Sequence, residues 1–93
     1  MSSIKRIVLD VLKLHHPNVL DFAKRIAEQD TGYYVKVTVA EMDEKTESIV
    51  MTIEGEDIQF DSIVETISNM GATVHSIDEV EVTRTTSQSE AGS

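Results

Sequence analysis

The stretch IKRIVLDVLKL, residues 4–14, decides the fold of this chain. Its odd positions Ile7, Leu9 and Val11 are all apolar, whereas the even positions mix charged residues with Val and Leu. This period of two predicts a half-buried β-strand, because successive side chains of a strand point to opposite faces of a sheet. We expect the strand to lie in the middle of a sheet with its apolar face against helices. The mixed character of the other face predicts contact with a second subunit.

The composition predicts one acidic, soluble domain. The 93 residues, 40% of them hydrophobic, suffice for a single core. Seventeen acidic residues against eight basic ones give a formal charge of -9, which repels nucleic acid and anionic membranes, so neither is an expected partner. The absence of cysteine excludes disulfides and thiolate sites and favours a reducing cytoplasmic location. No apolar run has the length of a signal peptide or a membrane span.

The rest of the chain reads as a helix, a hairpin, a second helix and a final strand. Apolar residues at three- and four-residue steps predict the helices, and alternation predicts the strands. The expected elements are a helix over 19–27 stopped by Gly32, strands over 33–42 and 49–54 joined by a charged loop over 43–47, a helix over 60–70 stopped by Gly71, and a strand over 73–83. A change of parity between Val74 and Ile77 predicts a β-bulge. Residues 4–83 are expected to form the single domain, and the small, polar residues 84–93 a disordered tail.

This order of elements predicts a fold of the α+β class. Strand, helix, strand, strand, helix, strand is the order of the ferredoxin-like βαββαβ sandwich, in which two helices cover one face of an antiparallel sheet. The sheet order should then be 4-1-3-2. The first strand would lie between the third and the fourth.

The sequence also resembles a known archaeal family, the domain of unknown function 211. The resemblance rests on RIVLDVLK over 6–13, on Pro17, on TIEG over 52–55 and on HSIDEV over 75–80, and it extends over about residues 4–83. Membership implies a ferredoxin-like fold and assembly into closed rings of several subunits. The family brings no established reaction or ligand, so no catalytic residue can be carried over.

The topology suggests one candidate metal site. The end of the first strand, the start of the fourth and the tip of the hairpin should meet at one end of the sandwich. The imidazoles and carboxylates expected there are those of His15, His16, His75, Glu41, Asp43, Glu44 and Glu47. Histidines would select zinc, nickel or copper, and carboxylates calcium or magnesium. The alternative is a solvated hairpin tip, since the loop lacks the glycine and the distal glutamate of an EF-hand. In a closed ring, however, repeated acidic clusters at subunit seams would bind calcium or magnesium.

The face of the sheet that helices cannot cover predicts the subunit contacts. Its candidate residues are Val8, Asp10, Leu12, Ala40, Val50 and, on the last strand, Ile77. A carboxylate such as that of Asp10, buried there, would need a partner such as Arg6 or Lys36. The leading interpretation is therefore a non-enzymatic, self-assembling protein.

Three other functions would each need particular residues in this sequence. A small-ligand regulatory module, by analogy with amino-acid-binding domains of similar topology, would use Gly32, Gly55 and Gly71. An enzyme of the acylphosphatase type would need a basic anion cradle after the first strand, and residues 15–18 provide neither arginine nor a glycine-rich loop. RNA binding would need paired aromatic residues on the open face of the sheet, which the sequence does not supply.

Overall fold

The computed structural model describes residues 1–84. Its elements follow the expected order: β1 (Ser2–Leu14), α1 (Val19–Ala27), β2 (Tyr34–Met42), β3 (Thr46–Glu54), α2 (Phe60–Asn69) and β4 (Ala72–Arg84). The expected tail falls almost wholly on residues 85–93, which lie outside the described part of the chain. Arg84, assigned to that tail, is the last residue of β4.

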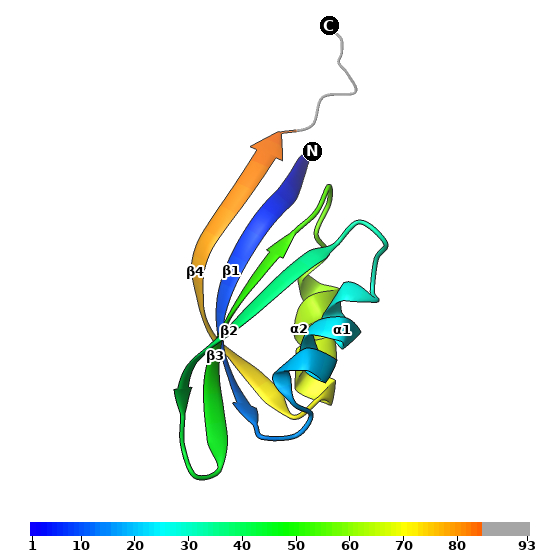
Figure 1. Cartoon of the computed structure of the whole chain (residues 1–93). Helices are drawn as coiled ribbons and strands as arrows, with labels where there is room; N and C mark the ends of the chain where they lie inside the picture. The colour runs from blue at the N-terminus through cyan, green and yellow to red at the C-terminus, as the bar shows by residue number, and fades with distance from the viewer. Residues whose placement is uncertain (85–93) are drawn as a thin grey trace, which may run out of the picture.

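The four strands form one antiparallel sheet in the order β2-β3-β1-β4, which is the expected order 4-1-3-2 in reverse. Both helices lie against the same face of this sheet (Figure 1). The α+β, ferredoxin-like architecture is therefore confirmed. The free ends of β1 and β4 extend beyond the helices, so that part of the sheet has no helical cover (Figure 1).

The core lies between the helices and the inner face of the sheet. Alternate residues of β1 and β3 point into it, as the period of two requires. Its buried residues are Ile7, Leu9, Val11, Phe22, Ile26, Ile49, Met51, Ile53, Ile58, Ile63, Ile67, Met70 and Ala72. The neighbouring central strands β1 and β3 thus supply six of these thirteen residues, and one face of each helix closes the cluster.

Helix α1 begins and ends with local hydrogen bonds. The Asn18 side chain accepts a hydrogen bond from the backbone N–H of Asp21 at 2.9 Å, which is the usual role of an N-cap residue. The expected stop at Gly32 is wrong. Glu28 caps the helix in a right-handed conformation and its N–H bonds the Lys24 carbonyl, so no left-handed glycine is needed. Gly32 lies in the connection to β2.

Helix α2 and strand β4 confirm the two signals read in this region. Gly71 has a φ of +79°, the left-handed conformation that glycine adopts at little cost, and it follows the Met70 cap. Strand β4 then shifts its register against β1 between Val74 and Ser76, and again between Ile77 and Glu79. These irregularities explain the change of parity.

The observed hairpin loop is shorter than the loop over 43–47 that the sequence predicted. Strand β3 begins at Thr46, so only residues 43–45 connect the two strands, and the Asp43 N–H closes the turn by donating to the Thr46 carbonyl at 2.8 Å. Glu47, expected at a solvated tip, instead lies in β3 and is buried. Its side chain falls on the same face as Ile49 because the two positions are two residues apart.

Candidate functional site

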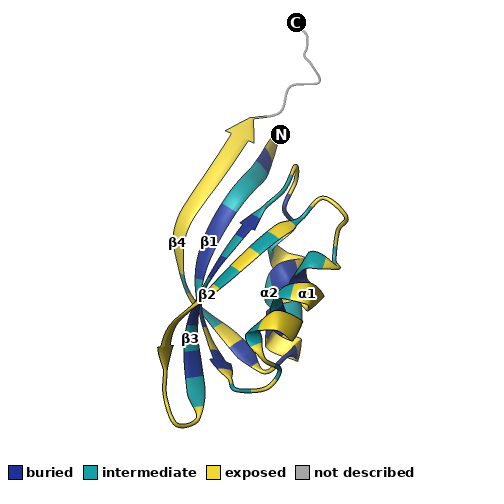
Figure 2. Ribbon diagram, viewed as in Figure 1, coloured by how far each residue is buried: buried dark blue, intermediate teal, exposed yellow. Residues whose placement is uncertain are grey.

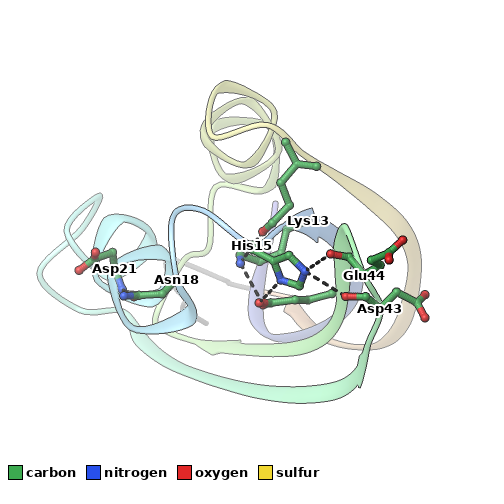
Figure 3. A network of polar contacts seen from close by, with 8 residues as sticks. Lys13, His15, Asn18, Asp21, Asp43 and Glu44 are labelled. Carbon is green, nitrogen blue, oxygen red and sulfur yellow. Dashed lines mark hydrogen bonds and ion pairs between the residues drawn. The ribbon is translucent and has the colours of Figure 1, made fainter.

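The end of β1 and the β2–β3 hairpin meet at one end of the sheet, as the topology predicted. Leu14 pairs with Thr46 and Lys13 with Glu47, while Lys13 also faces Ala72 at the start of β4. The residues with the most extensive polar contacts gather here. We call Lys13, His15 and Glu47, with the backbone carbonyls of Asp43 and Glu44, the Glu47 cluster (Figure 3).

Lys13 occupies a core-facing position and is buried. Its ammonium donates a hydrogen bond to the Leu14 carbonyl at 2.7 Å and forms an ion pair with Glu47 Oε1 at 3.0 Å. The Phe22 ring centroid lies 5.9 Å from Nζ, within the range of a cation–π contact. The ammonium thus makes two hydrogen bonds, one of them to a carboxylate, and lies within cation–π range of an aromatic ring. The charge can therefore remain in the interior.

His15 connects the second oxygen of Glu47 to the hairpin loop. Nδ1 lies 3.0 Å from Glu47 Oε2, and Nε2 lies 3.0 Å from the carbonyl oxygens of both Asp43 and Glu44 (Figure 3). A carbonyl oxygen only accepts hydrogen bonds, and so does an ionised carboxylate. Both ring nitrogens must then donate, which requires the imidazolium form.

The electrostatics of the cluster agree with this protonation state. The hydrogen bond to Glu47 is the main cause that raises the pKa of His15, and the Glu44 carbonyl adds to it. The hydrogen bonds from His15 and Lys13 lower the pKa of Glu47, in that order of importance, and outweigh the opposing effect of burial. One carboxylate thus pairs with two cations and fixes the loop to the end of β1.

The other candidate metal ligands do not join this cluster through side-chain contacts. Glu41, Asp43 and Glu44 are exposed, and only the backbone of the last two contacts His15. His16 is exposed in the β1–α1 connection. His75 lines a hollow of about 180 Å³ with Asp10, Leu12 and Ser48, none of which belongs to the Glu47 cluster. Among residues 1–84, no group of three or more histidine, aspartate or glutamate side chains is arranged to hold a metal ion.

The candidate interface residues on the open face differ in accessibility. Val8 is buried although no helix covers it, Asp10 and Val50 are half-buried, and Leu12 and Ala40 are exposed. Within the described chain Asp10 makes no ion pair.

Arg6, offered as a partner for Asp10, binds two other carboxylates of this face. Its Nη1 lies 3.4 Å from Glu54 Oε2, and its Nε lies 3.0 Å from Glu79 Oε2. The centre of the open face is therefore less apolar than expected. Six large hydrophobic residues are exposed on the edge strands, namely Tyr34, Val39, Met42, Ile77, Val80 and Val82.

Two of the three candidate glycines line a second hollow. Gly32 and Gly55 border a space of about 360 Å³ together with Lys5, Arg6, Tyr34, Glu54, Glu56 and Glu81. A side chain at Gly55 would place Cβ 3.0 Å from the Tyr33 ring, so the Tyr33 side chain would have to shift to admit one. Gly71 does not line this hollow.

Reasoning from the sequence missed the buried role of Lys13 and Glu47. A signal was present, because Lys13 continues the core-facing odd positions of β1 and Glu47 continues those of β3. Two opposite charges that each extend an apolar alternation, on strands expected to be neighbours, indicate a buried ion pair.

The comparisons with known proteins identify the family. The family described as uncharacterised ArCR, domain of unknown function 211, matches residues 5–90. The uncharacterised protein MJ0319 of Methanocaldococcus jannaschii is 46% identical over 80 residues, which cover 86% of this chain and 82% of that protein. No helix within residues 1–84 is long and apolar enough to cross a membrane. With most of its length matched, this chain belongs to the domain of unknown function 211 family.

Proposed function

We propose that this protein is a non-enzymatic, cytoplasmic, self-assembling protein whose subunits join through the edges of their sheets into a closed ring. The observation that carries the proposal is the edge strand β4 with its exposed apolar side chains. It pairs with β1 on one side, and its other side has no strand partner in the described chain. Ile77, Val80 and Val82 are 52%, 51% and 55% exposed.

The position of these side chains explains their exposure. Val80 is in register with the buried Ile7, and Val82 with Ile4. Figure 2 shows β4 exposed along its outer part, where it extends beyond the helices. A strand of 13 residues with a free edge and apolar side chains is a template for pairing with another chain. Monomeric proteins usually protect such an edge with charge, proline or a covering segment. Strand β4 carries Asp78, Glu79 and Glu81, but no strand of the described chain covers its outer side. A second copy of the chain would supply that cover.

The opposite edge of the sheet offers a matching surface. Strand β2 is unpaired on its outer side in the described chain, and Tyr34, Val39 and Met42 are exposed on it. Pairing β4 of one subunit with β2 of the next would be a head-to-tail contact, and such contacts close into rings when the rotation between subunits allows it. Leu12 and Ala40, exposed on the open face, would flank these seams.

Divalent cations at the seams form the second part of the proposal. Glu47 is already bound by Lys13 and His15, so the free carboxylates of the hairpin are those of Glu41, Asp43 and Glu44. Neighbouring subunits would bring copies of these exposed groups together. Calcium and magnesium prefer such oxygen ligands.

Light scattering coupled to size exclusion tests the assembly. The wild-type protein should elute as a multimer at micromolar concentration, and Val80→Lys combined with Val82→Lys should reduce it to a monomer. Leu20→Lys is the control, because Leu20 is 61% exposed and lies on α1, not on either edge strand. A monomeric wild type, or a double variant that keeps the wild-type mass, would refute edge-to-edge assembly. Masses unchanged by calcium, magnesium or chelator would refute only the cation part.

A second candidate function is favoured by the hollow at Gly32 and Gly55. Its volume of about 360 Å³ lies within the range of small-molecule sites, and charged side chains line it. A ligand-binding regulatory module would use this hollow. A thermal-shift screen with amino acids and nucleotides tests this function, since a bound ligand raises the melting temperature by mass action. A melting temperature that no compound changes would count against a ligand-binding module.

A further inference from the structure

The hollow beside Gly55 is built on one row of side chains that crosses the open face. The register pairs Tyr34 with Glu54, Glu54 with Arg6, and Arg6 with Glu81, so these four residues are neighbours across β2, β3, β1 and β4. Directly opposed residues of paired strands share a face. Neighbouring strands lie about 4.8 Å apart. The row therefore alternates acid, base and acid at short intervals, with an aromatic ring at one end.

The charges of the hollow are only partly paired. Lys5 donates to the Glu56 carbonyl at 2.8 Å and to its carboxylate at 3.1 Å. Arg6 contacts Glu54 through Nη1 and Glu79 through Nε, which leaves Nη2 without a partner among residues 1–84. The carboxylate of Glu81 has no ion pair or hydrogen bond in the described chain. Arg6 Nη2 and the Glu81 carboxylate are thus available to a ligand, on adjacent strands.

We propose that this hollow binds a small zwitterion of the α-amino-acid type, an inference that rests on the second candidate function above. The ligand's carboxylate would accept from Arg6 Nη2, and its ammonium would donate to Glu81. The two charges of an α-amino acid are separated by little more than a hydrogen bond, which suits groups carried by neighbouring strands. The ring of Tyr34, 62% exposed, would border the ligand's side chain.

The same charges disfavour the simpler ligand classes. A purely anionic ligand, a nucleotide included, would meet three carboxylates and a protein of charge -9. A purely cationic ligand would lie next to Lys5 and Arg6 and would offer no acceptor to Arg6 Nη2. A zwitterion satisfies the free groups of both signs. The missing side chains of Gly32 and Gly55 leave the space open.

Calorimetry on the full-length protein with defined probes tests this inference. The probes are L-leucine, L-phenylalanine and L-lysine, each also as its N-acetyl derivative and its amide. Free amino acids should bind, and both blocked forms should lose binding. Glu81→Gln should weaken binding about tenfold, the scale of one lost charge-assisted hydrogen bond. Asp61→Asn, on α2 and outside the hollow, is the matched control and should bind as the wild type does.

Each alternative result leads to a definite conclusion. Binding of the amides or of the N-acetyl forms with equal strength would overturn the zwitterion assignment and leave the ligand-binding module standing. Equal weakening by Asp61→Asn would place the ligand elsewhere and also overturn it. No heat with any probe, together with a flat thermal-shift screen, would overturn both. A circular dichroism spectrum of Glu81→Gln identical to the wild type excludes misfolding as the cause of lost binding.

Discussion

Replacing Glu47 by glutamine should destabilise the protein far more than any exposed charge does. The Lys13 side chain is 1% exposed and that of Glu47 7%, so the substitution leaves an ammonium in the interior without its counter-charge. Breaking a buried ion pair in this way costs about 3–5 kcal/mol. The Leu14 carbonyl and the amide oxygen of the new side chain still accept hydrogen bonds, so we expect the lower end of that range. The free energy of unfolding of a domain is typically about 5–15 kcal/mol, so a loss of this size would be easily measured.

The assay is urea unfolding followed by circular dichroism at pH 7. It should be run at two protein concentrations, because assembly makes apparent stability depend on concentration. Glu56→Gln is the matched control. The Glu56 side chain is 97% exposed, so its ion pair with Lys5 should contribute at most about 1 kcal/mol. Combining Lys13→Met with Glu47→Gln removes the orphaned charge. That double variant should be more stable than Glu47→Gln alone.

Two outcomes would refute this reasoning. The first is a loss for Glu47→Gln no larger than that for Glu56→Gln. The second is a double variant whose loss equals the sum of the two single losses, because residues that interact directly show a coupling energy in such a cycle. Either result would mean that the ion pair contributes nothing specific in this setting.

Two further predictions concern the same end of the molecule. A group with a raised pKa stabilises the fold below its unfolded pKa and loses that effect as the pH rises through its folded pKa, whereas a group with a lowered pKa loses it as the pH falls through its folded pKa. The backbone amides of residues 43–46 should therefore be best protected from hydrogen exchange at pH values between the lowered pKa of Glu47 and the raised pKa of His15. The measurement should run from about pH 3 to 9, which brackets the ordinary pKa values of both groups. Protection that does not change over this range would contradict the prediction. Gly71→Ala should cost about 1–2 kcal/mol in urea unfolding because of its left-handed backbone, whereas Gly32→Ala, with no atom within 4 Å of an added Cβ, should cost less than about 1 kcal/mol; equal losses would refute the backbone explanation.

The elements and their order could be read from the sequence because each depends on local chemistry. Period-two alternation in β1 and β3, helical spacing in α1 and α2, and the Gly71 stop all reflect which side chains a strand or helix must bury. The sheet order followed from the few topologies open to such an order of elements. Gly32 failed as a helix stop because hydrogen bonds at Glu28 had already ended α1.

The candidate site could be predicted only in its location. The meeting of β1 with the hairpin was correct, and His15 does reach the loop. His75, expected at the same end, belongs to a hollow with Asp10 on the open face. The bulge between Val74 and Ser76 changes which face each residue of β4 presents, and a sequence pattern reveals a bulge without fixing its position.

The sequence by itself determined an acidic α+β domain, its family and the two faces of its central strand. Only the tertiary structure decided which charges meet. Lys13 and Glu47 are 34 residues apart in the chain, and the register of β1 against β3 places them in contact. The same holds for Arg6 between two carboxylates on the open face. The physical reason is that periodicity reports the face on which a side chain lies, whereas its partner depends on the alignment of distant strands.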